Sequence, residues 1–421
     1  MSKISFYREI NFKKTEIGEI PRKWGISPLK GKVKKIKAGG TPKTTIKEYY
    51  ENGTIPFVKI EDLTQNGKYL TKTTLKITEK GLKNSSAWIV PINSVLLAMY
   101  GSLGEVSINK IKVATNQAIL GIVPKEKKLN SEFLYYWFLK FKPNWIKYAK
   151  LTTQANLTKP IVEKIKLPIP PLEEQKNIAE VLKDFDDLLE NIEKQIKTLE
   201  RVKKGLMNIY FTKGVFKHET FKDTELGRIP AEWRVRKVKD LLNLRKPLIK
   251  GKKPTLEGND LIPYVNTEYL RVDKITQYSS ANNKDLAVNE NDILILWDGS
   301  NAGEIFKGKY GILGSTFVRF NFIKTRNIDR NYIFYFFKAR IEKILKLITQ
   351  GTGIPHVDKK ILLNRVVLLP PLKEQKAIAE RLKTIDDQIE NLKKQKDHLQ
   401  KVKKKFMDLL LTGKIRVKIH S

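Results

Sequence analysis

The strongest constraint on the fold is an internal repeat. Residues 170–183 read PPLEEQKNIAEVLK and residues 370–383 read PPLKEQKAIAERLK, an offset of 200 positions. The match continues without a gap to Thr212 and Thr412, and about half of the positions are identical. A repeat of this length indicates that one structural unit occurs twice in the chain.

A second, shorter match opens each copy. The sequence TEIGEIPRKW at 15–24 returns as TELGRIPAEW at 224–233, and the residues between the matched segments diverge strongly. A common frame with divergent interiors suggests two domains of one design that act on different targets. We therefore expect a globular domain at 1–169, a helix at 170–213, a second domain at 214–369, and a second helix with a C-terminal tail at 370–421.

The repeated segments have the heptad spacing of long helices. Each follows a Pro-Pro pair, which marks a boundary, and should run for about 38 residues, or roughly 57 Å. Because so long an apolar stripe needs a partner, we expect the two helices to pack on each other. The predicted seam comprises Ile178, Leu182, Phe185, Leu189, Ile192, Ile196, Leu199, Leu206, Ile378, Leu382, Ile385, Ile389, Leu392, Leu399 and Phe406.

The remaining helix positions are mostly charged or amide residues, as a solvated face requires. Lys203 and Lys396 interrupt the seam, and the pairs Asp186-Asp187 and Asp386-Asp387 are interpreted as polar surface. The sequence leaves parallel and antiparallel pairing open, although a two-fold axis crossing the helices would require antiparallel pairing. The pair would make a stiff spacer, long compared with a DNA turn of about 34 Å. The alternative is an ordinary helical hairpin or a dimerisation coil.

The charge balance indicates a polyanionic partner. The chain has 421 residues, with 81 Lys and Arg against 45 acidic residues, a formal charge of +36. Compositional bias that enriches Lys usually raises Glu as well, whereas here the acidic residues lag, so nucleic acid is the leading candidate. The absence of Cys, of a signal peptide and of an apolar run near the roughly 20 residues that span a bilayer predicts a cytoplasmic protein.

Each globular domain has a mixed α and β pattern. Segments rich in β-branched and aromatic residues predict strands at 54–60, 88–92, 94–100, 114–124, 261–270, 291–297 and 315–320, and helices are predicted at 131–141 and 331–348. The fold class is therefore α+β, with two domains and two long helices. The dense lysines Lys30, Lys32, Lys34, Lys35 and Lys37 suit contacts to phosphates, or else a solvated strand face.

Polar residues on the predicted loops are the candidate DNA-binding residues. Asn and Gln suit adenine, Lys and Arg suit guanine, Asp and Glu accept from cytosine, and Ser and Thr serve either; turn chemistry explains many of them equally well. The first domain offers Thr41, Lys43, Lys59, Asp62, Tyr100, Ser102, Asn116, Gln117, Gln154 and Asn156. The second domain offers Lys252, Lys253, Tyr264, Asn266, Glu268, Asp298, Ser300, Asn301, Ser315, Thr316 and His356.

Sequence motifs for catalysis are missing. We find no phosphate-binding loop, no dinucleotide fingerprint, no amino-methyltransferase signature and no nuclease pattern of paired carboxylates with Lys. The four His residues, at 218, 356, 398 and 420, are too scattered to predict a metal site. A chain with much binding surface and no such motif is expected to be a non-catalytic adaptor or specificity factor, with neither a catalytic residue nor a metal ligand.

The chain resembles the specificity subunits of type I restriction-modification systems. The resemblance rests on KLPIPPLEEQKNIAEVL and VLLPPLKEQKAIAERL, on GGTPK followed by IPFVKIEDL, and on LLAMYGSLGEV, VATNQAIL and LTTQANLTK. The second domain departs from it, with DGSNAGE in place of GSLGE and GTGIPHVDK in place of TQANLTK. That departure weakens the transfer of individual contact residues in this domain.

The resemblance implies a specific function. Each globular domain would bind one half of a bipartite site in double-stranded DNA, and the two helices, packed as an antiparallel coiled coil, would set the spacing. Two methyltransferase subunits would dock along the helices and modify adenine with S-adenosylmethionine, and restriction subunits would use ATP and magnesium, so this chain would need no cofactor. The alternatives are an orphan specificity-like regulator, an RNA-binding protein and a structural coiled-coil protein.

Overall fold

The computed structural model describes residues 3–151, 155–256, 260–282, 284–323, 327–348 and 355–420. The chain divides into two units, one of residues 1–192 with 395–421 and the other of residues 193–394. The two long helices, α6 (Leu172–Lys213) and α11 (Leu372–Leu411), contribute one half to each unit. Each unit therefore contains a globular domain and a segment of both helices.

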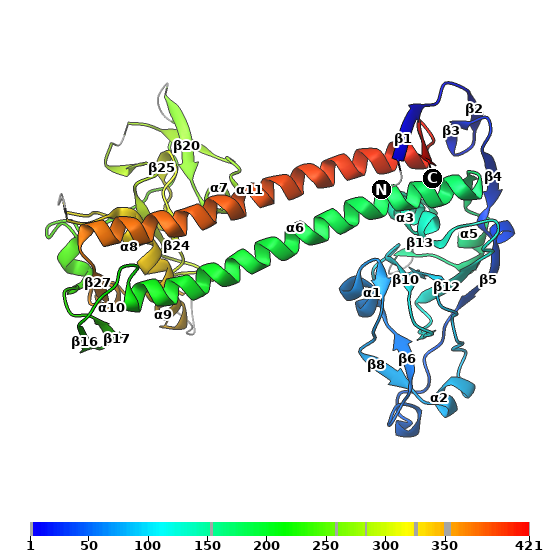
Figure 1. Ribbon diagram of the computed structural model, residues 1–421, viewed down its shortest axis with the longest axis horizontal. Helices are drawn as coiled ribbons and strands as arrows, with labels where there is room; N and C mark the ends of the chain where they lie inside the picture. The colour runs from blue at the N-terminus through cyan, green and yellow to red at the C-terminus, as the bar shows by residue number, and fades with distance from the viewer. Residues whose placement is uncertain are drawn as a thin grey trace. The chain divides into compact units, whose positions relative to one another are not determined.

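The long helices run antiparallel in both units (Figure 1). In the first unit, the rings of Phe185 on α6 and Phe406 on α11 lie 5.4 Å apart. In the second, Lys203 on α6 forms a 2.5 Å ion pair with Asp386 on α11. Because later residues of one helix meet earlier residues of the other, the pairing left open by the sequence is antiparallel. All fifteen predicted seam residues are buried or half-buried.

The helices are longer than the heptad count predicts. They have 42 and 40 residues, since each starts directly after its Pro-Pro pair rather than at the first seam position. Glu173 and Glu174 in the first turn of α6, and Glu374 in that of α11, place negative charge where the helix dipole favours it.

The first domain is built on a five-stranded sheet. Its strand order is β5-β12-β9-β10-β7, antiparallel except for the β10–β7 pair, and Leu97 in the centre pairs with Val106 on one side and Leu120 on the other. Helix α3 (Ser131–Phe141) packs against β9 and β10. The strands of this sheet are β5 (Val33–Ala38), β7 (Tyr69–Leu70), β9 (Val95–Ala98), β10 (Val106–Asn109) and β12 (Ile119–Pro124).

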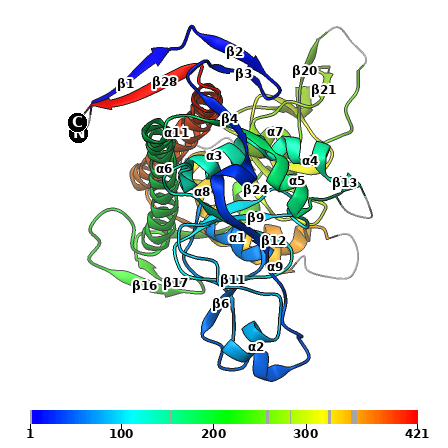
Figure 2. The ribbon, with the colours of Figure 1, turned by 90° about the vertical axis from the view of Figure 1, so that its right-hand side faces the viewer.

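A smaller lobe and several short elements complete this unit, and Figure 2 shows the lobe of β6 and α2 beside the main sheet. The lobe is a three-stranded sheet of order β11-β6-β8. Its elements are β6 (Ile55–Val58), β8 (Leu75–Ile77), β11 (Ala114–Thr115), α1 (Ile60–Asn66) and α2 (Glu79–Lys83). The remaining helices are α3 (Ser131–Phe141), α4 (Trp145–Tyr148) and α5 (Lys159–Lys164). The remaining strand pairs are β1 (Lys3–Arg8) with β28 (Ile415–His420), β2 (Phe12–Thr15) with β3 (Gly18–Pro21), β4 (Gly25–Pro28) with β15 (Lys166–Ile169), and β13 (Lys150–Leu151) with β14 (Ala155–Asn156).

The second domain repeats this topology despite its different sequence. Its main sheet has the order β19-β26-β23-β24, which matches β5-β12-β9-β10, and its second sheet has the order β21-β20-β25-β22. The parallel pair β20–β25 corresponds to β6–β11. The strands of these sheets are β19 (Leu248–Lys250), β20 (Leu261–Val265), β21 (Tyr278–Ser280), β22 (Ala287–Val288), β23 (Ile293–Leu296), β24 (Ile305–Lys307), β25 (Gly311–Leu313) and β26 (Phe317–Phe320).

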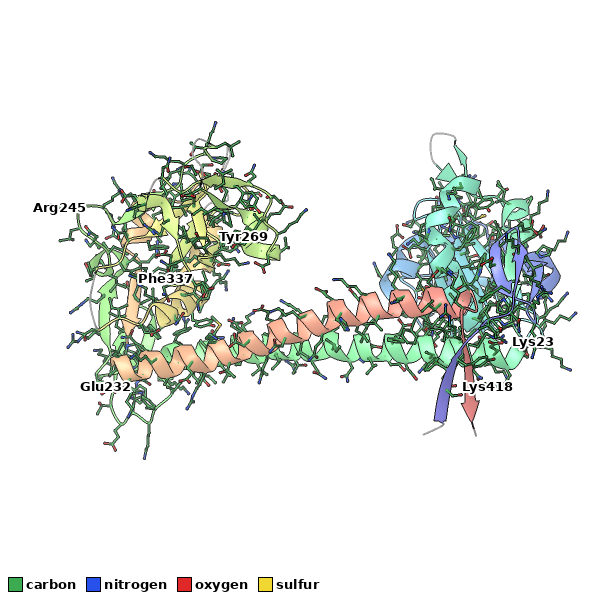
Figure 3. The ribbon with its side chains drawn as sticks, turned by 90° about the horizontal axis from the view of Figure 1, so that it is seen from above. Lys23, Glu232, Arg245, Tyr269, Phe337 and Lys418 are labelled. Atoms are coloured by element: carbon green, nitrogen blue, oxygen red, sulfur yellow. The ribbon has the colours of Figure 1, made fainter. Side chains whose placement is uncertain are left out.

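Its helices and hairpins also recur. The helices are α7 (Thr267–Val272), α8 (Arg330–Phe336), α9 (Glu342–Ile348) and α10 (Lys359–Leu363), and a π-helical turn, Phe337–Ile341, joins α8 to α9. Strand β16 (Phe221–Thr224) pairs with β17 (Gly227–Pro230), and β18 (Arg234–Lys237) pairs with β27 (Val366–Leu369). In Figure 3, Phe337 lies inside this domain and Arg245 lies at its surface.

Each domain shares its core with both long helices. In the first unit, Ile178 and Leu182 of α6 and Leu410 and Leu411 of α11 belong to the core of the domain. In the second, Ile378 and Leu382 of α11 are joined by Phe211 of α6. The start of one helix and the end of the other are thus built into each domain.

One strand prediction was wrong and another was too long. Residues 88–92 contain only an isolated bridge at Val90, and 261–270 ends as helix α7 after Val265. In α7 the Asn266 side chain accepts from the Tyr269 amide at 2.9 Å, an N-cap that turns the chain from strand into helix.

Within the described ranges, no helix is long and apolar enough to cross a membrane.

Candidate nucleic-acid interface

The first domain is joined to α6 by a buried glutamate of the repeated Pro-Pro-Leu-x-Glu-Gln motif. Glu174 accepts from the indole of Trp24 at 3.0 Å and from two nitrogens of Arg416, the Nη2 contact being 2.7 Å. Arg416 also pairs with Glu9, and its side chain is only 6 % exposed. The hydrogen bonds to Glu174, together with the negative charge of that carboxylate, raise the pKa of Arg416. These contacts join the start of α6 to the end of the chain.

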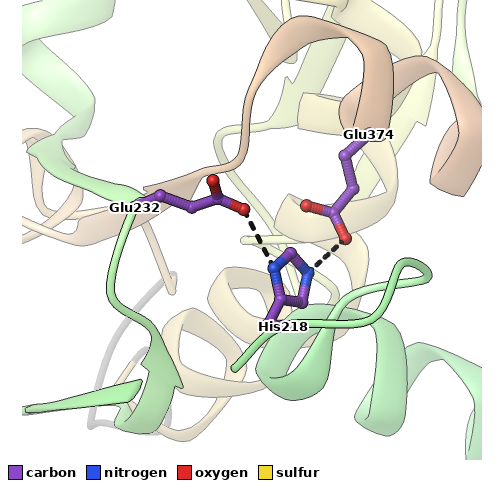
Figure 4. A group of neighbouring side chains, drawn as sticks. All are labelled: His218, Glu232 and Glu374. Atoms are coloured by element: carbon purple, nitrogen blue, oxygen red, sulfur yellow. Dashed lines mark hydrogen bonds and ion pairs between the residues drawn. The ribbon is translucent and has the colours of Figure 1, made fainter. Parts of the chain in front are cut away.

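The second domain uses the equivalent glutamate with a different partner (Figure 4). Glu374 accepts from the indole of Trp233 at 3.0 Å and from the amide of Val215 at 2.9 Å. His218 lies between two carboxylates, with Nε2 2.9 Å from Glu374 and Nδ1 2.9 Å from Glu232. An imidazole thus occupies the place that a guanidinium has in the first unit.

The glutamine of the motif fixes the helix behind each sheet. Gln175 accepts from the amide of Asn130, the N-cap of α3, at 2.9 Å, and Gln375 accepts from the amide of Asp329, the N-cap of α8, also at 2.9 Å. Both side chains are buried, and each donates to the carbonyl of the first proline in its Pro-Pro pair, Pro170 or Pro370, at 2.9 Å. The Glu and Gln of the repeated motif therefore join each domain to the long helix that follows it.

The candidate residues of the first domain gather at one end of its main sheet, which we call the first edge. Three hydrogen bonds close this end, Met99 N to Ala118 O at 2.7 Å, Leu157 N to Met99 O at 2.9 Å, and Gly39 N to Ile119 O at 3.2 Å. Two more, Gly40 N to Thr115 O at 3.0 Å and Asn116 N to Val58 O at 3.2 Å, attach the smaller lobe. Together these bonds bring Thr41, Lys59, Tyr100, Asn116, Gln117 and Asn156 together at this edge.

The same five hydrogen bonds recur at the second edge, in the second domain. They are Trp297 N to Thr316 O at 2.8 Å, Val357 N to Trp297 O at 3.0 Å, Gly251 N to Phe317 O at 3.0 Å, Lys252 N to Leu313 O at 3.4 Å, and Gly314 N to Val265 O at 3.1 Å. They place Lys252, Lys253, Asp298, Ser315, Thr316 and His356 together. The recurrence makes Asp298 equivalent to Tyr100, His356 to Asn156, Ser315 to Gln117 and Lys253 to Thr41.

Several predicted contact residues have structural roles instead. Asp62 is 1 % exposed, and its carboxylate accepts from the amides of Lys59 and Thr74 at 2.8 and 3.0 Å. Tyr264 is 5 % exposed, and its hydroxyl lies 3.0 Å from the carbonyl of Lys252. Asn266 caps α7. Capping and burial satisfy these groups internally, which corrects the prediction that Asp62 and Tyr264 contact bases.

The other candidates lie on the surface or at its margin. Lys43, Glu268, Ser300 and Asn301 are exposed and Ser102 is half-buried, whereas Gln154 lies outside the described residues. The predicted phosphate-contact lysines lie in the short 3-10 turn that precedes β5 and in β5 itself. Lys30, Lys34 and Lys35 are exposed, and Lys32 and Lys37 are half-buried. Lys34 pairs with Glu126 at 3.2 Å, and the ammonium of Lys35 lies 4.4 Å from the Trp88 ring centre.

Comparisons with known proteins account for both copies. A family described as type I restriction modification DNA specificity domain matches residues 21–201 and again 230–401. A relative from Methanocaldococcus jannaschii, the type I restriction enzyme MjaVIII specificity subunit, is 35% identical, with 99% of this chain and 98% of the relative covered. The putative MjaX specificity subunit of the same organism is 33% identical, with 99% of each covered.

The chain belongs to the type I restriction-modification specificity family. The solved S subunit of a type I system from M. genitalium supports the fold, with a TM-score of 0.59 at 15% identity over 92% of this chain and 96% of that one. Each matched range of this specificity subunit covers one domain and most of the long helix that follows it.

One group of acidic and histidine side chains has the composition of a metal site. Among the described residues, His218, Glu232 and Glu374 are the three whose candidate ligand atoms lie within 4.8 Å of one another. The two carboxylates face opposite nitrogens of the ring, however, as Figure 4 shows. Because a single ion binds one imidazole nitrogen, the three groups as placed do not converge on one point, and the arrangement fits a hydrogen-bonded bridge better.

The sequence interpretation missed a polar contact between the long helices. Asp186 accepts from Tyr136 of α3 at 2.5 Å and pairs with Lys403 of the opposite helix. In the second unit, Asp386 accepts from Tyr335 of α8 at 2.8 Å and pairs with Lys203. These aspartates were interpreted as solvated surface, and Lys203 as a break in the seam. The signal was available, because Asp and Lys recur at the 200-residue offset.

Burial shapes the electrostatics around this contact. Burial, strengthened by the charge of Asp186, raises the pKa of Tyr136, and Tyr335 beside Asp386 behaves in the same way. Lys68 lies 2.8 Å from the Tyr136 hydroxyl and 3.2 Å from Glu132, and burial lowers its pKa although Glu132 opposes the change. The Tyr136 and Tyr335 contacts thus join each domain to both long helices.

Proposed function

We propose that this specificity subunit binds double-stranded DNA at a bipartite site, with one half-site for each domain and a spacing set by the long helices. The observation that carries the proposal is the duplicated edge. The same five hydrogen bonds assemble polar loop residues in both domains, and the DNA specificity family matches both copies. Two similar scaffolds with different edge residues fit two half-sites of different sequence.

The charge supports a nucleic-acid partner. A formal charge of +36 provides the long-range attraction to phosphate that places a protein on DNA. The lysines before and along β5 are suited to contact the backbone, which positions the domain without reading sequence. Base edges are then left to the polar loops of the two edges.

The proposed partners are two modification subunits docked along the helices, joined by restriction subunits. Leu188, Val202 and Ile209 on α6 are 52%, 44% and 49% exposed, which leaves apolar surface on the helix for other subunits. S-adenosylmethionine, ATP and magnesium would bind to those partners, and this chain would act without catalysis of its own. The assembled complex would methylate adenine and cleave DNA.

The test is co-expression with a modification subunit of a type I system, followed by sequencing of methylated adenines. A single gapped bipartite motif that disappears without this chain would support the proposal. A soluble complex that yields no motif would favour an orphan regulator. A structural coiled-coil protein would bind DNA weakly and with little salt dependence, and an RNA-binding protein would prefer single strands or A-form duplex.

The modular part of the proposal needs its own test. Exchange of residues 37–159 for those of another family member should change the first half-site and leave the second half-site and the spacing unchanged. A change in both halves would contradict independent reading by the domains. Insertion of four residues within 178–206 should alter the preferred spacing or abolish assembly while half-site identity is kept; an unchanged spacing would count against the spacer role.

A further inference from the structure

The two edges differ in chemistry although their backbones correspond. At the first edge, the equivalent positions hold Thr41, Tyr100, Gln117 and Asn156, which are all uncharged. At the second edge they hold Lys253, Asp298, Ser315 and His356. Lys250, the last residue of β19, corresponds to Ala38 of β5, since each lies opposite the equivalent residue of the neighbouring strand. At these positions the first edge therefore has only neutral groups, whereas the second has the charged groups of Lys250, Lys253 and Asp298.

A surface ion pair dominates the second edge. Lys250 Nζ lies 2.8 Å from Asp298 Oδ2, with side-chain exposures of 54% and 38%. The main chain of Asp298 bridges to that of His356, and Gly299 N donates to Pro355 O at 2.9 Å, so the carboxylate stands on a braced loop. Both charged groups are accessible, and an exposed pair of this kind contributes little to stability.

A single G·C pair matches both members of this ion pair. In the major groove, guanine presents the O6 and N7 acceptors and cytosine presents the N4 amino donor beside them. Lys250 can donate to guanine while Asp298 accepts from cytosine, so the two side chains exchange their mutual contact for contacts with the two bases. An A·T pair places its donor, adenine N6, between two separate acceptors, adenine N7 and thymine O4, so it lacks the two adjacent acceptors that guanine offers to the ammonium.

At the first edge, Ala38 and Tyr100 stand at the positions of Lys250 and Asp298, and an oriented amide at another position offers the polar groups. The Thr41 hydroxyl donates to Gln117 Oε1 at 2.5 Å, and both residues are exposed. The carbonyl oxygen keeps a second lone pair and the amide nitrogen keeps its two donors. This acceptor-and-donor pair is the set that reads adenine at N6 and N7.

We propose that Lys250 and Asp298 read a G·C pair in the second half-site, whereas Gln117, held by Thr41, reads an adenine in the first. The inference rests on the proposed function and adds the identity of one base pair in each half. Lys250 and Asp298 are specificity-determining residues in this scheme, and Thr41 is a positioning residue for Gln117.

The experiment uses the full chain with its modification subunit and sequences methylated adenines for the variants Lys250→Met and Asp298→Asn. Each should reduce the preference for one G·C pair in a single half-site by about tenfold, within the range for one base contact. The matched control is Lys246→Met with Asp285→Asn, a surface pair in the same unit at 3.0 Å with exposures of 55% and 73%. The control should leave the motif unchanged.

The charge-exchange variant distinguishes base reading from a structural role. Lys250→Asp combined with Asp298→Lys keeps the ion pair but reverses its direction, so the preferred pair should change from G·C to C·G at the same position. Gln117→Ala should relax one A·T position in the other half-site only, and Thr41→Val should weaken the same preference. A motif identical to that of the unaltered chain in the Lys250 and Asp298 variants would overturn the proposal. Absence of any motif with the unaltered chain would instead refute the proposed function.

Discussion

Replacement of Glu174 by Gln should loosen the junction between the first domain and the helix pair. The Glu174 side chain is 9% exposed and receives two guanidinium nitrogens and one indole nitrogen. In the carboxylate, one oxygen accepts from Arg416 Nε, and the other accepts from both Arg416 Nη2 and the Trp24 indole. The amide of Gln has one oxygen and one NH₂ group, so the NH₂ group must face the donors at one of these two positions. Since Glu9 would be the only carboxylate left beside Arg416, the loss is that of a buried ion pair broken on one side, about 3–5 kcal/mol.

The measurement is native-state hydrogen exchange of the β4 strand and the first turns of α6. A loss of about 3–5 kcal/mol corresponds to exchange faster by roughly 10² to 10⁴ where these amides open through the junction. The control is Glu173→Gln, the adjacent residue, which is 75% exposed and pairs with Lys176 at 3.2 Å. The control should change exchange by less than about tenfold, as for a surface pair worth about 0–1 kcal/mol. Exchange in the Glu174 variant within threefold of the control would refute the reasoning.

Three further predictions follow from buried polar groups. Tyr136→Phe removes the hydrogen bond to Asp186 and should cost about 1–2 kcal/mol at neutral pH. Burial and the charge of Asp186 raise the pKa of Tyr136, so the stability that this tyrosine contributes is complete below the unfolded pKa near 10 and is lost as pH rises above that value. The free energy of unfolding, measured by chemical denaturation, should therefore fall less steeply at alkaline pH in the variant than in the unaltered chain. An equally steep fall in both would contradict this reasoning. Lys307 is half-buried, and burial together with the charge of Lys383 lowers its pKa. The charged ammonium therefore destabilises the fold at neutral pH. This destabilisation decreases as pH rises toward the unfolded pKa of 10.5, because the folded chain loses the proton first. Lys307→Met should therefore raise the free energy of unfolding at pH 7 by no more than about 1 kcal/mol, since solvent screens a half-exposed charge. A clear destabilisation would show that the contact of the ammonium with the Phe334 ring, whose centre lies 5.6 Å away, outweighs the cost of burial. Gln375→Ala should cost about 2–4 kcal/mol, because it leaves the Asp329 amide and the Pro370 carbonyl without their partner. The comparison is Gln388→Ala, a change of the same type at an exposed position of α11, and equal denaturation midpoints for the two variants would argue against the junction role.

The sequence by itself determined the duplication, the long helices and the class of partner. These follow from local patterns, since heptad spacing fixes which face of a helix is apolar and the Pro-Pro pairs fix where each helix begins. The seam residues from Ile178 to Phe406 are all buried or half-buried for this reason. The charge excess needed no fold at all, because phosphate attraction depends on net charge.

Only the tertiary structure decided what the polar residues do. Asp62, Asn116 and Asp298 are alike as loop residues in the sequence, yet the first is buried as a cap and the other two stand at the edges. Asp186 and Lys403 are 217 positions apart, and nothing local shows that they meet. The antiparallel direction and the equivalence of the two edges arise in the same way, because hydrogen bonds between distant segments are set by the closing of the sheets and the packing of the helices, not by the residues beside them in the chain.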